Sequence, residues 1–185
     1  MPKIDQLPVD ELDPKLIELI EAAPLPGLGD GPRCDGTAAK LRKHVGSNAW
    51  KGSLIEAGLW LLAGDLAQSH DISQSQDSAE GAFWHGIMHR REGDYGNSKY
   101  WFRRVGKHAV HRELAACIQA KLNDFSSDLP TAALVDSDTL PNGLVDACQD
   151  ALTQHPDRVN DIRLICWWEW QLLFAATLTA VAQSE

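Results

Sequence analysis

The chain has 185 residues, 44% of them hydrophobic, and a formal net charge of −9 at pH 7. This length provides one domain with a full hydrophobic core, whereas two independent domains would be small. The negative charge argues against a partner that is a nucleic acid or an anionic membrane, because both attract positively charged proteins.

The cysteines are scattered and show no short Cys–Cys spacing; they are Cys34, Cys117, Cys148 and Cys166. This pattern predicts free thiols in a reducing compartment, with neither a disulfide framework nor a cysteine zinc site. The first residues include no basic segment followed by an apolar one, so we expect no secretory signal. The expected location is the cytoplasm.

The elements are predicted to be helical almost throughout. Residues 1–36 hold a helix that begins at Asp13-Pro14 and ends near residue 22, followed by a Pro/Gly-rich loop over 24–36. A short helix is expected over 37–44. The core hairpins of residues 47–122 contain helices predicted at 47–67, 76–92, 95–105 and 108–122.

The last third of the chain is predicted to contain a loop and two helices. Residues 123–142 are polar and proline-punctuated, which is typical of a long loop, or of a lid with a short element inside. Residues 143–185 hold the C-terminal helices, at 143–153 and 157–182. Alternation with a period of two is absent, so the predicted fold is a single all-α domain.

The C-terminal helix is apolar enough to raise the question of a membrane span. Residues 164–182 are almost continuously apolar, but Glu169 and Gln171 lie inside the segment. We therefore expect a Trp-rich helix buried in the protein, or at a homodimer interface, and no membrane span. Glu169 then needs a cationic or hydrogen-bonding partner from elsewhere in the fold.

Two segments begin alike and suggest a repeated hairpin. Gly64-Asp65 and Gly93-Asp94 each follow a predicted helix, where a turn between antiparallel helices is expected. The pattern of helix, Gly-Asp turn and second helix resembles the tetratricopeptide helix–turn–helix. We therefore expect stacked, tetratricopeptide-like hairpins.

A second resemblance rests on residues 84–106, which read Trp-His-Gly-Ile-Met-His-Arg-Arg-Glu-Gly-Asp-Tyr-Gly-Asn-Ser-Lys-Tyr-Trp-Phe-Arg-Arg-Val-Gly. This run is similar to the signature of an uncharacterised all-helical family. Residues 69–72 and 169–174 also resemble the pattern of that family. The resemblance implies a shared fold and a shared pocket, and it assigns no activity.

The same segment contains a candidate metal site. On a helix over 76–92, His85, His89 and Glu92 lie on one face, since they are spaced by four and three residues. Two histidines one turn apart with an oxygen ligand suit zinc or another divalent ion. His70 would supply a fourth ligand. The structural alternative is a seam in which the histidines hydrogen-bond between helices.

The segment is also strongly basic. Residues 89–112 carry seven cationic side chains against two carboxylates; the cations are Arg90, Arg91, Lys99, Arg103, Arg104, Lys107 and Arg112. A basic, aromatic-lined face is able to hold a carboxylate or phosphate, and arginine gives bidentate contacts. We expect Trp84 and Trp101 at the rim of a pocket, and His108 and His111 at the surface.

Three hypotheses for function follow from these patterns. The leading one is a pocket that binds a small anionic molecule or an acidic peptide end; its residues are His70, His85, His89, Arg91, Lys99, Tyr100, Arg103 and Glu169. The second is a metal-dependent hydrolase with His85, His89 and Glu92 as ligands and Glu169 or Asp94 as base. The third is a scaffold protein without a ligand.

Overall fold

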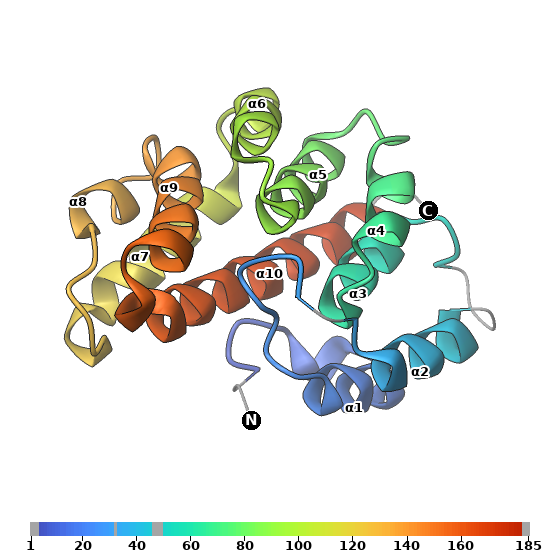
Figure 1. Ribbon diagram of the computed structural model, residues 1–185. Coiled ribbons are helices and arrows are strands. Elements are labelled where there is room, and N and C mark those ends of the chain that lie inside the picture. The colour runs from blue at the N-terminus through green and yellow to red at the C-terminus, as the bar shows by residue number, and fades with distance from the viewer. Residues whose placement is uncertain (1–3, 32, 46–49, 183–185) are drawn as a thin grey trace.

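A computed structural model describes residues 4–31, 33–45 and 50–182 (Figure 1). Within these ranges the chain forms helices and no strand, which confirms the all-α prediction. The helices of the first half are α1 (Pro14–Ala22), α2 (Asp35–Val45), α3 (Leu54–Ala63), α4 (Leu66–Ser73) and α5 (Ala79–Glu92), after a 3-10 turn at Val9–Glu11. Those of the second half are α6 (Tyr95–Val105), α7 (Ala109–Ala120), α8 (Thr131–Leu134), α9 (Leu140–Thr153) and α10 (Val159–Ala182), with 3-10 turns at Leu122–Asp124 and Pro156–Arg158.

Two Gly-Asp pairs end one helix and begin the next. Gly64 and Gly93 have φ angles of 74° and 87°, in the left-handed region that favours glycine. The carboxylates of Asp65 and Asp94 then accept from the backbone N–H groups of the third residues that follow, which caps α4 and α6. The hairpins α3–α4 and α5–α6 result, and the two helices of each pack together.

The predicted helix over 47–67 is the main correction to the element boundaries. Residues 46–49 lie outside the described part of the chain. Within the rest of the predicted range, helix α3 begins at Leu54, after the capping residue Ser53. It ends at Ala63 because Gly64 turns the backbone, and α4 starts afresh at Leu66. The segment 123–142 was predicted to be a loop, or a lid with a short element inside. It contains α8, and α9 begins at its end, with Pro141 in the first turn of α9.

The long helix α10 lies through the middle of the molecule and contacts α3, α5, α7 and α9 (Figure 1). The indole N–H of Trp170 donates to the carbonyl of Gly58 over 2.8 Å, and that of Trp84 donates to Thr177 Oγ1 over 3.1 Å. Trp84 is completely buried, so its predicted place at a pocket rim is wrong. The three tryptophans of α10 are also buried within this one chain. These tryptophans would therefore not form the contact surface of a homodimer.

The segment Pro156–Ala182 is long and apolar enough to cross a membrane by length and composition, but 56% of its most apolar stretch is buried inside the fold. Glu169 lies in the middle of this segment and is 2% exposed. Both of its oxygens accept from Arg90 of α5, which is equally buried. This ion pair supplies the partner that Glu169 required, and it joins α10 to α5.

Candidate functional site

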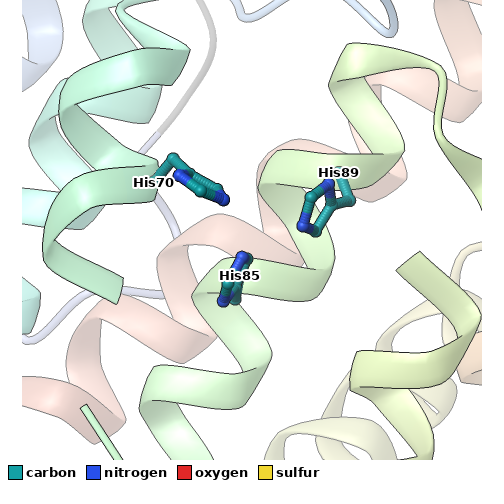
Figure 2. A group of neighbouring side chains, drawn as sticks. All are labelled: His70, His85 and His89. Carbon is teal, nitrogen blue, oxygen red and sulfur yellow. The ribbon is translucent and has the colours of Figure 1, made fainter. Parts of the chain in front are cut away.

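The candidate site lies between α4 and α5, which bring three histidines together. His70 belongs to α4, whereas His85 and His89 lie one turn apart on α5, and the three rings face a common space (Figure 2). Ser78 caps the start of α5 by accepting from the N–H of Gly81 over 3.0 Å. The buried side chains of Ile87 and Met88 fix the rotation of α5 about its axis.

The three imidazoles are close enough to share a metal ion. Each offers one ring nitrogen, and these three atoms lie within 4.8 Å of one another. Around a tetrahedral zinc ion with Zn–N distances of about 2.1 Å, neighbouring donors are roughly 3.4 Å apart. The rings would have to move closer together to bind one ion, and His70 is the partly exposed member of the group, with 34% of its side chain accessible.

His85 is the least satisfied polar side chain of the group. It is 3% exposed, and neither Nδ1 nor Nε2 has a hydrogen-bond partner among the described residues. Its ring stacks on Trp101 at 4.1 Å and on His89 at 4.7 Å between centroids. Burial lowers the pKa of His85 to about 4, so the ring is neutral at pH 7. A buried polar group without a partner costs roughly 1–3 kcal/mol, which a bound ligand would offset.

His89 is held by two further side chains. Its Nδ1 lies 3.1 Å from Glu92 Oε2, and its Nε2 lies 3.0 Å from Asn97 Nδ2. Because a carboxylate only accepts, Nδ1 donates to Glu92, and Nε2 accepts from the Asn97 amide. Burial lowers the pKa of His89, although Glu92 opposes this effect. Histidines that bind metal ions usually donate their other ring N–H to a carboxylate or a carbonyl, which fixes the orientation of the ring.

Glu92 therefore lies behind His89, and His70 completes the group of three donors instead of Glu92. The reason is geometric: a side chain three residues after His89 reaches back to the near nitrogen of the same ring. The lone pair of His89 Nε2 accepts a hydrogen bond from Asn97. A metal ion bound to this nitrogen would replace that hydrogen bond.

A cleft of about 800 Å³ opens beside His70, the one histidine of the group among its described lining residues, which also include Glu92. Most of the charged side chains that line the cleft are acidic. The acidic ones are Asp30, Asp35, Asp65, Asp71 and Glu92. One cation, Arg33, lines it and pairs with both Asp35 and Asp65. His70 therefore borders a cleft whose lining is mostly negatively charged.

The other residues predicted to bind an anion do not join the histidines. Arg91 is buried and donates to the carbonyls of Leu61 and Gly29, so it holds the loop before α2. Lys99 pairs with Asp146, Tyr100 is 45% exposed, and Arg103 lines a different cleft. Glu169 is buried in an ion pair with Arg90. The eight residues predicted to form one pocket therefore lie in several separate parts of the structure.

Three contacts of the site were absent from the sequence prediction: the stacking of Trp101 on His85, the bond from Asn97 to His89, and Asp71 beside His70. Trp101 and Asn97 lie on α6, the second helix of the hairpin. The Gly-Asp turn was the available signal, because it folds α6 back onto α5.

No family model, curated protein or solved structure matches this chain. Two resemblances therefore stay predictions. One is that of residues 84–106 to a helical family, and the other is that of the hairpins to tetratricopeptide units.

Proposed function

We propose that this protein is a metal-dependent hydrolase that binds one divalent transition-metal ion, zinc in the first instance, at His70, His85 and His89. The observation that carries the proposal is His85, whose two ring nitrogens are buried without a partner inside a cluster of histidines. A structural seam would give these nitrogens hydrogen bonds. Imidazole ligands suit zinc, copper, iron and nickel.

Three histidine ligands leave the fourth position of a tetrahedral ion open, which is the arrangement of catalytic sites. An ion held there would bring the pKa of a bound water close to 7. Glu92 would fix the orientation of His89. Asp71 lines the adjoining cleft, with Oδ1 4.0 Å from His70 Nδ1, and we assign it as proton acceptor.

The two bases expected from the sequence are engaged elsewhere. Glu169 is buried against Arg90, and Asp94 caps α6 by accepting from the N–H of Asn97. The acidic lining of the cleft favours a neutral or cationic substrate over an anionic one, because the carboxylates repel negative charge. The four cysteines are free thiols, which supports a cytoplasmic location.

The test is a zinc titration of chelator-treated protein in competition with a chromophoric chelator. We expect one tight site per chain, and a loss of more than about 100-fold in affinity for His85→Leu and for His89→Leu. The metal-free His85→Leu protein should be at least as stable as the wild type, because the variant removes unpartnered polar atoms. His155→Leu, at a histidine outside the cluster, is the matched control. Zinc binding weaker than micromolar, or unaffected by His85→Leu, would contradict the proposal.

The hydrolase part has its own readout. A panel of esters and amides, neutral and cationic, should reveal a zinc-dependent turnover that Asp71→Asn reduces when both proteins are saturated with zinc. Zinc binding without turnover of any panel member would leave a metal-binding protein and overturn the catalytic assignment. Binding of an anion, the function expected first from the sequence, is a second candidate, and it is favoured by a cleft elsewhere on the molecule.

A further inference from the structure

A second cleft, of about 540 Å³, lies between the end of α6, the start of α7 and the segment that leads into α9. It shares no lining residue with the cleft beside the histidines. Its volume falls within the range of about 300–1,000 Å³ that is typical of small-molecule sites. The chemistry of its walls differs from that of the rest of this acidic chain.

The walls are cationic. Arg103, Lys107 and Arg112 line the cleft, against one carboxylate, that of Asp138. Within the described residues, no ion pair joins any of these three cations to an acidic side chain. By contrast, Lys99 on the same helix pairs with Asp146. In a chain of net charge −9, three cations left without carboxylate partners around one hollow indicate an external anion.

Two helices also begin at this cleft. Ala109 begins α7, and Pro141 and Asn142 belong to the first turn of α9. The N-cap residue of α9, Thr139, donates its hydroxyl to the carbonyl of Ala133 and does not cap the helix. The partial positive charge of helix N-termini favours a bound anion.

His111 supplies an independent indication of a ligand. It lines the cleft, is 3% exposed, and its Nε2 is buried without a partner in the part of the chain that the structure describes. The sequence predicted His111 at the surface, and the structure corrects this: its ring packs against Phe83 at 4.7 Å between centroids. His111 is therefore a lining residue of the cationic cleft that carries a polar atom without its hydrogen bond.

We propose that this cleft binds a small phosphorylated molecule, whose phosphate is held by Arg103, Lys107 and Arg112 at the N-terminus of α7. A phosphate matches the site better than a carboxylate does, because three cations and two helix N-termini face a single hollow and a phosphate monoester carries up to two negative charges. A long polyanion fits poorly, because the chain as a whole is acidic.

The test measures binding by chelator-treated protein, so that its result does not depend on the histidine site. Inorganic phosphate and glycerol 3-phosphate are titrated by calorimetry, with glycerol and with chloride at matched ionic strength as negative controls. We expect both phosphates to bind. The double variant Arg103→Gln/Arg112→Gln should weaken both by about tenfold or more, since two charge-assisted contacts are lost.

Arg104→Gln is the matched control. Arg104 is the chain neighbour of Arg103 on α6, but its guanidinium lies over the Trp101 ring at 5.1 Å and it does not line the cleft. This variant should bind phosphate like the wild type. Equal binding by the double variant, no binding by the wild type, or binding of single-stranded RNA without binding of either phosphate would each overturn the proposal. Circular dichroism checks that the variants are folded.

Discussion

The buried ring of His111 makes a quantitative prediction about acid stability. The substitution is His111→Leu, which keeps a similar volume between α7 and the aromatic rings around it. In the folded protein, burial, with a smaller contribution from nearby His108, lowers the pKa of His111 from 6.5 to about 4. The unfolded chain therefore binds a proton at this position below pH 6.5, whereas the folded protein does so only near pH 4.

Stability therefore falls as the solution is acidified through this window. Each pH unit between the two pKa values lowers the free energy of unfolding by about 1.4 kcal/mol. Between pH 7.5 and pH 5 the wild type should lose about 2 kcal/mol more than His111→Leu. His85 also titrates with a lowered pKa, but it is present in both proteins and cancels in the comparison.

The assay is urea unfolding followed by circular dichroism at both pH values, in phosphate-free buffers that contain a chelator. At pH 7.5 the variant should match the wild type or exceed it, because it removes a buried nitrogen that has no partner. The same pH dependence in both proteins would refute the reasoning, because the folded and unfolded states would then bind protons equally at His111.

Three further substitutions test the packing and the site. Glu169→Gln should lower the free energy of unfolding by about 3–5 kcal/mol in urea titrations, because Arg90 would be left as an uncompensated buried charge. Gly58→Ala should lower it by about 1–3 kcal/mol, because the added Cβ would lie 2.8 Å from Trp84 Cζ2. Glu92→Gln should weaken zinc binding by about 10- to 100-fold in the chelator competition, since it alters the partner of His89.

Matched controls separate these effects from general damage. Asp146→Asn removes the partner of Lys99 in a largely exposed pair, so it should change stability by less than about 1 kcal/mol. Gly36→Ala places a methyl group in the first turn of α2, where no heavy atom lies within 4 Å, and it should be neutral or stabilising. If either control were as destabilising as its test variant, the structural explanation of that variant would fail.

Helix boundaries were predictable where a glycine ends one helix and a capping residue begins the next. The bounds of α6 follow from Gly93-Asp94 before it and Gly106 after it, because a left-handed glycine and a capping aspartate act through neighbouring atoms only. At Gly64 the same pair lay inside a continuous apolar pattern. The pattern therefore carries the predicted helix past Gly64 to residue 67, and it predicts no separate helix at α4.

The composition of the site was only partly accessible from the sequence. The pairing of His85 with His89 follows from helical periodicity, whereas the approach of His70 depends on how α4 packs against α5, which periodicity does not determine. The burial of His111 did have a local signal: the ring precedes Leu114 by three residues and so lies on the apolar face of α7.

The most direct test of the central claim is anomalous X-ray diffraction at the zinc edge from crystals of the zinc-loaded protein. The proposal predicts one strong anomalous peak per chain, about 2.1 Å from a ring nitrogen of each of His70, His85 and His89. It also predicts that Asn97 no longer donates to His89. A peak at any other position, or no peak after zinc loading, would contradict the assignment of these histidines as a metal site.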